Sequence, residues 1–518
     1  MHTRVNGGAV IGLDGAPICV EVDISSGMQK TTIVGLPDAA VGEARERVRS
    51  AIRNAGAGFP TRRVTVNLAP AHIRKEGAGF DLPIAVGMLV ATGQICESAV
   101  RDTLFLGELA LDGELRHVRG VLSVAAAARD AEVRRIVVPR VDAPEASLVD
   151  GLEVVGVDSL REWIEIATEE RPIGEAIWPT DTEDVQDRAE PFDGHDFSDV
   201  RGQEHVKRAL EVAAAGGHNM LMCGPPGAGK TLLASCLPGI LPPLTTHEAL
   251  EVTKIASVAG LTGEGASLVR ERPFRAPHHT ISNAGLVGGG QRLRPGEVTL
   301  AHRGVLFLDE LPEFSVRALE SMRQPLEDRY ITISRAHGTI TYPADITLIA
   351  AMNPCPCGNF GTDQACSCSD GAVYRYQRRV SGPVLDRIDM FIDVPRVEVQ
   401  KLMQRTGLDE LPVGDSSTSV RERVTAARAL QRDRFGCEGP GSNAALSARD
   451  VHHHCLSMLE DRAQTLVREA VDRLSLSARG FHRVLKVART IADLSESEVI
   501  TARHIAEAVQ YRRRVNLG

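Results

Sequence analysis

The sequence is poor in aromatic residues, which make up only 4% of its 518 positions. Many proteins that bind single-stranded nucleic acid stack successive bases on aromatic side chains, so the composition disfavours that mode of binding. An excess of positive charge is also missing, because the formal net charge is −9. A nucleic-acid partner would have to meet a local basic surface, such as the pore of a ring, and be held through its phosphates.

Long hydrophobic runs are absent as well. No stretch of about eighteen apolar residues occurs, and the start, Met1-His-Thr-Arg-Val-Asn6, lacks the apolar core of a signal peptide. We therefore expect a cytoplasmic protein with no membrane partner. A length of 518 residues with 43% hydrophobic content allows several domains with cores of their own.

A phosphate-binding loop lies in the middle of the chain. It consists of Gly224, Pro225, Pro226, Gly227, Ala228, Gly229, Lys230 and Thr231. The spacing of the glycines lets backbone N–H groups face a polyphosphate, while Lys230 reaches the outer phosphates and the Thr231 hydroxyl a Mg²⁺ ion. A short apolar strand pattern precedes the loop and a helical pattern follows it, which places the phosphates at a helix N-terminus. The pattern predicts binding of ATP and Mg²⁺.

Two further strands end in polar residues. The run Val305-Leu-Phe-Leu308 is typical of a strand buried in a parallel sheet, and Asp309 and Glu310 follow it. Asp309 can hold Mg²⁺ through water, and Glu310 can orient the water that attacks the γ-phosphate. The strand pattern that ends at Met352 is followed by Asn353, whose amide we expect close to the same phosphate.

Two arginines follow these motifs. Arg387 stands in the tight, proline-led segment Ser381-Gly-Pro-Val-Leu-Asp-Arg387, from which it could project toward a neighbouring subunit. Arg479 stands at the start of a helical pattern in the last part of the chain. Their order after the nucleotide motifs makes both of them candidates for phosphate contact.

The chain resembles the AAA+ ATPases of the magnesium-chelatase-like group and, within it, the YifB/ComM family. The resemblance covers nearly the whole chain and is carried by the strings Arg275-Ala-Pro-His-His-Thr280, Gly304-Val-Leu-Phe-Leu-Asp-Glu310 and Ala351-Met-Asn-Pro-Cys-Pro-Cys357, and by the helical pattern that begins at Ser477-Ala-Arg-Gly480. It implies that Asn353 is sensor 1, Arg387 an arginine finger supplied in trans, and Arg479 sensor 2. It also implies a homo-oligomer, in the form of a hexameric ring.

The resemblance implies an α/β fold with four segments. We expect a Lon-protease-like domain over residues 1–165, an acidic linker over 166–198, an AAA+ P-loop core with a parallel sheet over 199–410 and a helical lid over 411–518. The stretch that matches the serine position of active Lon-type proteases, 75–80, contains no Ser, and the stretch that matches the lysine position, 119–122, contains no Lys. Acyl transfer has no starting group there, so we interpret the domain as a scaffold or substrate-handling module.

Four of the ten cysteines are clustered directly after Asn353, and the other six are scattered singly. The cluster consists of Cys355, Cys357, Cys366 and Cys368. In a cytosolic chain this pattern favours a zinc site over disulfides, with free thiols or a redox pair as the alternatives, because the Cys-x-Cys spacing differs from that of common zinc ribbons.

The core carries two insertions. The long segment between Lys230 and Asp309 corresponds in the resembling family to a helix-2 insert. Residues 330–342 predict a β-hairpin with Arg335 and His337 near its tip, and such a hairpin points into the pore of ring helicases, where these two residues would contact DNA. An ordinary surface hairpin is the alternative.

Three functions compete. The first is an ATP-hydrolysing ring motor on branched or single-stranded DNA, as a branch-migration helicase in recombination or natural transformation, which the family resemblance implies. The second is a magnesium-chelatase-like motor that remodels a protein partner for metal insertion. It is disfavoured because such motor subunits lack the N-terminal domain and the four cysteines. The third, an ATP-dependent protease, is disfavoured by the missing Ser and Lys.

Overall fold

The computed structural model describes residues 1–75, 77–179, 194–263, 268–290, 294–335, 338–396, 415–436 and 439–512. The chain forms two compact units. The first unit comprises Met1–Ala189 and Thr246–Val269, and the second comprises Glu190–Thr245 and Arg270–Gly518. Within the described ranges, no helix combines the length and the apolar character needed to cross a bilayer.

The first unit is built on a seven-stranded sheet in the order β3-β4-β2-β1-β5-β8-β9. Its strands are β1 (His2–Ile11), β2 (Asp14–Ser25), β3 (Lys30–Val34), β4 (Arg63–Ala69), β5 (Thr103–Phe105), β8 (Arg135–Pro139) and β9 (Glu153–Val157). A two-stranded ribbon accompanies them, β6 (Glu108–Leu109) with β7 (Leu115–Arg116). Within the seven-stranded sheet the pairs β1–β2 and β2–β4 are antiparallel and the other pairs are parallel, while the β6–β7 ribbon is antiparallel. This half of the chain is therefore α/β with a mixed sheet.

The helices of the first unit pack on this sheet through apolar faces. They are α1 (Ala39–Asn54), α2 (Asp81–Ala91), α3 (Val121–Asp130), α4 (Ala143–Ala146), α5 (Leu160–Ala167) and α9 (Thr246–Ala259). At the start of α1, the Asp38 side chain accepts a hydrogen bond from the Val41 N–H, and the Val41 and Val48 side chains are buried. Capping and helical spacing of apolar residues explain why α1 forms where it does.

Helix α9 belongs to the first unit although it lies between two motifs of the second unit. The Ser257 hydroxyl lies 2.5 Å from Glu145 Oε1 and accepts a hydrogen bond of 2.9 Å from the Gly120 N–H. Burial raises the pKa of Glu145, and the Ser257 hydroxyl opposes that rise. A helix from the long segment between Lys230 and Asp309 is thus held in the first unit by buried polar contacts.

The second unit contains a five-stranded parallel sheet in the order β11-β12-β15-β10-β16. Its strands are β10 (Met220–Cys223), β11 (Phe274–Arg275), β12 (Val305–Leu308), β15 (Thr347–Met352) and β16 (Met390–Asp393). A separate antiparallel hairpin is formed by β13 (Tyr330–Arg335) and β14 (Gly338–Pro343). Every residue of β10, β12 and β15 is buried, as the continuous apolar runs predict.

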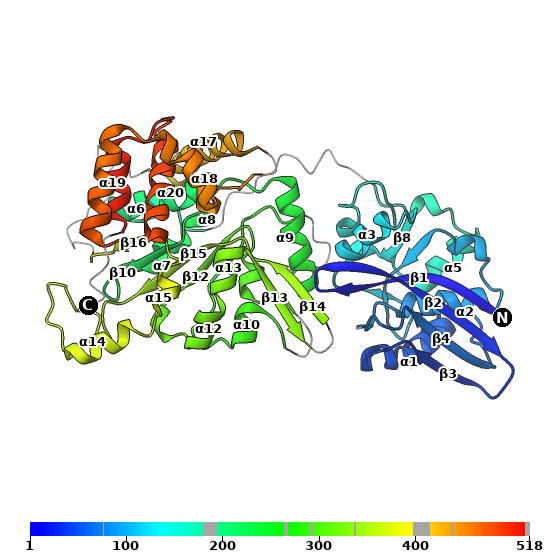
Figure 1. Cartoon of the computed structure of the whole chain (residues 1–518). Helices are drawn as coiled ribbons and strands as arrows, with labels where there is room; N and C mark the ends of the chain where they lie inside the picture. The colour runs from blue at the N-terminus through cyan, green and yellow to red at the C-terminus, as the bar shows by residue number, and fades with distance from the viewer. Residues whose placement is uncertain are drawn as a thin grey trace, which may run out of the picture. The chain divides into compact units, whose positions relative to one another are not determined.

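Helices surround this sheet and continue into a helical C-terminal region. Those of the sheet region are α6 (Glu204–Gly216), α7 (Lys230–Ser235), α8 (Leu237–Ile240), α10 (Asn283–Val287), α11 (Glu297–Leu300), α12 (Val316–Ser321), α13 (Arg323–Asp328), α14 (Asp370–Gln377) and α15 (Gly382–Leu385). The C-terminal ones are α17 (Ser417–Phe435), α18 (Ala448–His454), α19 (Asp461–Leu474), α20 (Ala478–Leu494) and α21 (Ala502–Gln510). Both α17 and α20 contact α6, and the orange to red helices of Figure 1 lie beside it.

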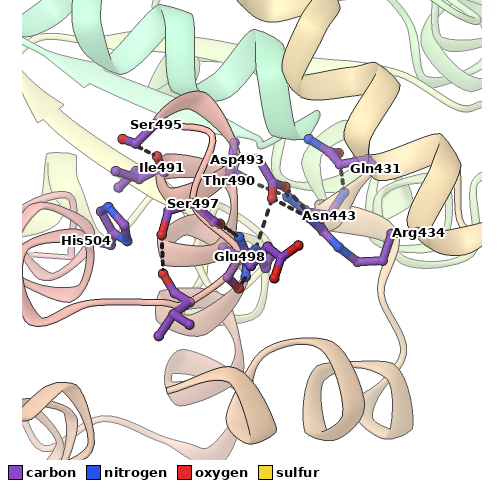
Figure 2. A network of polar contacts seen from close by, with 12 residues as sticks. Gln431, Arg434, Asn443, Thr490, Ile491, Asp493, Ser495, Ser497, Glu498 and His504 are labelled. Atoms are coloured by element: carbon purple, nitrogen blue, oxygen red, sulfur yellow. Dashed lines mark hydrogen bonds and ion pairs between the residues drawn. The ribbon is translucent and has the colours of Figure 1, made fainter. Parts of the chain in front are cut away.

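A buried polar network holds the C-terminal helices together (Figure 2). The Asp493 carboxylate accepts hydrogen bonds from Arg434 Nη2 at 2.5 Å, from Arg489 Nε at 3.0 Å and from Asn443 Nδ2 at 2.8 Å. Arg489 and Asp493 are each 1% exposed. Because a buried charge is costly without a partner, these contacts fix α17 and α20 in one arrangement.

Candidate nucleotide-binding and metal sites

The phosphate-binding loop connects β10 to α7, and its shape depends on glycine at three places. Gly227 and Gly229 have φ angles of +75° and +82°, in the left-handed region that glycine tolerates best. A Cβ on Gly224 would lie 2.2 Å from the Val394 carbonyl oxygen, so a side chain there would clash with the backbone after β16. The loop can therefore turn tightly and present its N–H groups at the start of α7.

The Lys230 ammonium group is turned into the loop. Its Nζ donates to the carbonyl oxygens of Gly224 at 2.6 Å and Pro225 at 3.0 Å, and to Asn353 Oδ1 at 3.0 Å. Burial lowers the pKa of Lys230, and the carboxylate of Asp309 opposes that change. The structure thus brings the loop lysine and the Asn353 amide together, as the parallel sheet predicts.

Thr231 and Asp309 meet at the ends of neighbouring elements. The Thr231 hydroxyl donates to Asp309 Oδ2 at 2.9 Å, and Asp309 Oδ1 accepts from the Glu310 N–H at 2.9 Å. A hydroxyl and a carboxylate side by side at a phosphate loop fit the oxygen ligands that Mg²⁺ prefers. These two residues would hold the ion.

Glu310 has a partner to which the sequence motifs assign no role. Its Oε2 lies 3.2 Å from His279 Nδ1, and the His279 ring lies edge-on to Phe314 with the ring centroids 6.4 Å apart. His279 follows β11 by four residues, and β11 runs parallel to β12, which ends just before Asp309. The sequence could have indicated the contact between His279 and Glu310 through their positions alone, because polar residues that follow neighbouring parallel strands meet at one edge of the sheet.

The two candidate arginines share one carboxylate. Arg387 Nη2 pairs with Glu327 Oε2, and Arg479 Nη2 lies 3.4 Å from Glu327 Oε1. Glu327 lies on α13 and Arg479 in the first turn of α20. The structure therefore brings Arg387 and Arg479 to the same place.

Asp389 connects the strand that leads into the phosphate loop with the helix that carries Arg479. Its Oδ2 accepts from the Asn219 N–H at 3.0 Å, and its Oδ1 accepts from Arg483 Nη1 at 2.8 Å. Burial raises the pKa of Asp389, but Arg483 and His218 outweigh burial and hold the pKa below its ordinary value. Asp389 thus remains ionised and ties β10, the Arg387 segment and α20 together.

We expect Asp389→Asn to destabilise the second unit by about 3 kcal/mol, because it leaves Arg483, whose side chain is only 17% exposed, without its counter-ion. A lowered native pKa means that the ionised form stabilises the fold above the unfolded-state pKa of about 3.9, and that this contribution is lost as the pH falls further. Thermal unfolding between pH 3 and pH 7 measures both effects. If the unfolding temperature of the variant fell with decreasing pH as steeply as that of the wild type, Asp389 would not be the ionised group that stabilises the fold.

The four clustered cysteines lie together between β15 and α14. Their four Sγ atoms all lie within 4.8 Å of one another, and three of the separations are 3.3, 3.5 and 3.7 Å. A tetrahedral zinc with Zn–S bonds of about 2.3 Å places its sulfurs about 3.8 Å apart, whereas a disulfide requires about 2.05 Å. The arrangement fits one zinc ion and does not contain a disulfide.

Backbone N–H groups favour the thiolate form of one member of this cluster, Cys357. Those of Asn359 and Ser367 lower the pKa of Cys357 to about 5. Thiolate is the form of cysteine that binds metals. The loop also touches the phosphate-binding loop, since a Cβ on Gly358 would lie 2.3 Å from Pro226 Cδ. A metal held here would brace the segment that packs on Pro226.

The predicted DNA contacts lie at the end of the β13–β14 hairpin. Arg335 is the last residue of β13 and pairs with Gly338, while His337 lies outside the described residues. The base of the hairpin is held by Asp345, which accepts from Arg329 Nη1 and Arg303 Nη1, each at 2.8 Å.

Comparisons with known proteins agree with this organisation. Family models described as magnesium chelatase, subunit ChlI, match residues 196–402, and models for the same subunit and for its C-terminal part match 20–142 and 414–512. The chain is 44% identical over 515 residues to competence protein ComM of Haemophilus influenzae, covering 98% of this chain and 97% of that protein. It is 43% identical over 512 residues to the uncharacterized protein YifB of Escherichia coli, covering 99% and 96%.

A more distant similarity covers only part of the chain. Over 170 residues it is 29% identical to the DNA replication licensing factor mcm2 of Xenopus tropicalis, covering 30% of this chain and 17% of that protein. The similarity to ComM and YifB instead extends over nearly the full length of this chain and of each of the two relatives. The chain therefore belongs to the YifB/ComM family of magnesium-chelatase-like proteins.

Proposed function

We propose that the protein is an AAA+ ATPase that forms a ring and moves on DNA, as a branch-migration helicase in recombination or natural transformation. One observation carries the ATPase part. Two hydrogen bonds connect the site residues at the carboxyl ends of β10, β12 and β15: Lys230 Nζ donates to Asn353 Oδ1 at 3.0 Å, and the Thr231 hydroxyl donates to Asp309 Oδ2 at 2.9 Å. Ligands of parallel α/β sheets bind at that edge.

Each residue has a defined task in this proposal. The loop N–H groups and Lys230 bind the outer phosphates of ATP, and Thr231 and Asp309 hold Mg²⁺. Glu310 orients the attacking water, and Asn353 hydrogen-bonds the same water or the γ-phosphate. Arg387 and Arg479 stabilise the charge that develops in the transition state. Arg387 pairs with Glu327, and no hydrogen bond or ion pair of the described residues joins it to the phosphate-binding loop, so it is suited to act on the nucleotide of a neighbouring subunit.

DNA as the partner is supported by the relatives and by the hairpin. One near-full-length relative is named a competence protein, and one partial relative a DNA replication licensing factor. The β13–β14 hairpin follows α13 directly and precedes β15, the strand that leads to Asn353, so DNA at its tip would lie on an element joined to the nucleotide site. With a net charge of −9, the contact is local and electrostatic.

A magnesium-chelatase-like motor is the second candidate, because three family models bear that name. Such a motor would hydrolyse ATP with the same residues and would respond to a protein partner instead of DNA. In the first unit, for which we propose a Lon-like fold, the stretch 119–122 that matches the catalytic lysine contains no Lys. Lys75 of the same unit is fully buried, and its Nζ donates to the Pro70 carbonyl oxygen.

The test is the ATPase rate of the full chain with and without branched or single-stranded DNA. We expect stimulation by DNA that weakens steeply between about 50 and 200 mM salt, because contacts to phosphates release counterions. Arg335→Ala combined with His337→Ala should lower this stimulation and leave the DNA-free rate unchanged. If DNA neither binds nor stimulates at low salt, the DNA-motor proposal is wrong and the chelatase-type candidate replaces it.

His279 gives a separate prediction about the hydrolysis step. We expect His279→Ala to lower kcat about tenfold with ATP affinity unchanged, because Glu310 loses the group that orients it. His279→Gln keeps a donor in reach and is expected to restore part of kcat. Single-turnover hydrolysis with a separate nucleotide-binding measurement distinguishes the two steps. A loss of binding without a change in kcat would show that His279 supports the fold of the site only.

A further inference from the structure

Glu327 contacts both candidate arginines, and the tasks assigned above do not include it. One carboxylate oxygen pairs with Arg387 and the other with Arg479. The side chains differ in exposure, at 13% for Arg387, 48% for Glu327 and 60% for Arg479. The Glu327–Arg387 ion pair is therefore the less exposed of the two, and the Glu327–Arg479 ion pair is open to solvent.

Each of the three nitrogens of the Arg387 guanidinium has a partner within its own subunit. Its Nε donates to the Arg323 carbonyl oxygen at 3.1 Å, its Nη1 to the Pro383 carbonyl oxygen at 2.8 Å, and its Nη2 to Glu327. An arginine binds phosphate best through two parallel N–H groups. Glu327 therefore competes with a phosphate for Nη2, and Arg387 binds a phosphate more strongly once its contact with Glu327 is given up.

The end of α13, which carries Glu327, is also linked to the β13–β14 hairpin by hydrogen bonds of Arg329. Arg329 follows Glu327 by two residues, has a φ angle of +62°, and accepts through its carbonyl oxygen from the Ala344 N–H at 2.8 Å. The Arg329 side chain donates to Asp345 Oδ1 at 2.8 Å. These contacts connect the end of α13, which carries Glu327, to both ends of the hairpin.

We propose that Glu327, Arg387 and Arg479 form an arginine latch. In the latch, Glu327 pairs with both arginines while the hairpin is free, and DNA bound to the hairpin moves α13 and releases them for the γ-phosphate of a neighbouring subunit. The latch rests on the proposed function, specifically on the role of Arg387 and on DNA as the hairpin's ligand. Because Glu327 is 48% exposed, a phosphate can replace it as the partner of the arginines, which suits a contact that has to open and close in every cycle.

The latch predicts that its removal activates the enzyme in the absence of DNA. Glu327→Gln keeps the size of the side chain and removes its charge, so the DNA-free ATPase rate of the full chain should rise about three- to tenfold, and the ratio of DNA-stimulated to DNA-free rate should fall. Glu327→Asp keeps the charge but is one methylene shorter, so its DNA-free rate should lie between those of Glu327→Gln and the wild type.

The matched control is Asp328→Asn, which removes the same charge from the next residue of the same helix. Among the contacts of the described residues, the arginines pair with Glu327 and not with Asp328, so this variant should keep the wild-type rates. Arg387→Ala in the Glu327→Gln background should abolish the activation. Since Glu327 is half exposed, wild-type thermal stability is expected for all Glu327 variants.

A DNA-free rate of Glu327→Gln at or below the wild-type rate overturns the latch and would show that Glu327 positions Arg387 for catalysis. The same holds if Asp328→Asn activates equally. These results differ from failure of the proposed function. If Arg387→Ala alone keeps full activity, the finger assignment and the latch fall together. If Arg387→Ala is inactive while Glu327→Gln is unchanged, only the latch falls.

Discussion

Mixing two inactive variants, Glu310→Gln and Arg387→Ala, is expected to restore ATP hydrolysis. Glu310→Gln keeps the Mg²⁺ ligand Asp309 but removes the carboxylate that orients water, so ATP binds and turnover nearly stops. Arg387→Ala removes a charge that acts on the neighbouring nucleotide, and a finger of this kind is worth about 10³–10⁵ in rate. Each variant alone is expected to be inactive for a different reason.

The recovery follows from the composite site. In a randomly mixed ring with equal amounts of both chains, about one junction in four pairs an intact Glu310 with an intact Arg387 of the neighbour. We therefore expect up to about a quarter of the wild-type rate if the junctions act independently, measured as phosphate release at a fixed total concentration of protein. DNA should raise this rate further.

The control is a mixture of Glu310→Gln with Lys230→Ala. Lys230 and Glu310 serve the same nucleotide from the same subunit, and both lie around Asp309 and Asn353. No junction of this mixture contains both residues intact, so it should stay inactive. Absence of recovery in the Glu310→Gln and Arg387→Ala mixture, with both variants assembled, would show that Arg387 does not act across subunits.

The nucleotide site could be predicted from the sequence to a large extent because its residues follow short buried strands. β10, β12 and β15 are continuous apolar runs, and their order in a parallel sheet places Lys230, Asp309 and Asn353 at one edge. The hairpin over residues 330–342 was predictable for the same reason, since alternating residues flank a turn. In each case local pattern and tertiary structure agree.

The contacts that were missed are long-range and involve residues outside any motif. Glu327 meets Arg479 across 152 positions of sequence, and nothing in its neighbourhood indicates that contact. Helix α9 is another case, because its own pattern does not show that Ser257 is held by Glu145 in the first unit. Periodicity identifies which face of a helix is buried, but it does not identify the partner that buries it.

Removing zinc from the four-cysteine cluster is expected to abolish ATP hydrolysis and to lower the stability of the second unit. The purified chain should contain one zinc ion, held by Cys355, Cys357, Cys366 and Cys368, whose Sγ atoms lie within 4.8 Å of one another. Structural zinc sites contribute on the order of 10 kcal/mol to folding in small domains, so even a fraction of that amount here is a large effect.

Loss of zinc is expected to affect the nucleotide site because the cysteine loop is short and packs against residues on both sides. Cys355 follows Asn353 by two residues, Gly358 packs against Pro226 of the phosphate loop, and the Pro354 carbonyl oxygen accepts from Gln377 Nε2 at 3.0 Å. Without a metal, several thiolates would repel one another at these positions. The segment should then loosen and shift the Asn353 amide away from Lys230, which lowers kcat more than ATP affinity.

The measurement combines elemental analysis, thermal unfolding and ATPase rate for the wild type, Cys357→Ser and Cys96→Ser, in reducing and anaerobic buffer. Cys96 is exposed and lies in the first unit, so Cys96→Ser controls for the loss of a thiol and should keep its zinc and activity. Cys357→Ser should lose both. A zinc-selective chelator in excess Mg²⁺ should reproduce the Cys357→Ser result with the wild-type chain, and added zinc should reverse it. Wild-type protein that is active and contains no stoichiometric metal would refute the zinc assignment. Free thiols or a redox pair would then remain as alternatives. A redox pair is compatible with the structure, because three of the sulfur pairs lie 3.3 to 3.7 Å apart and could be oxidised to a disulfide after a small movement.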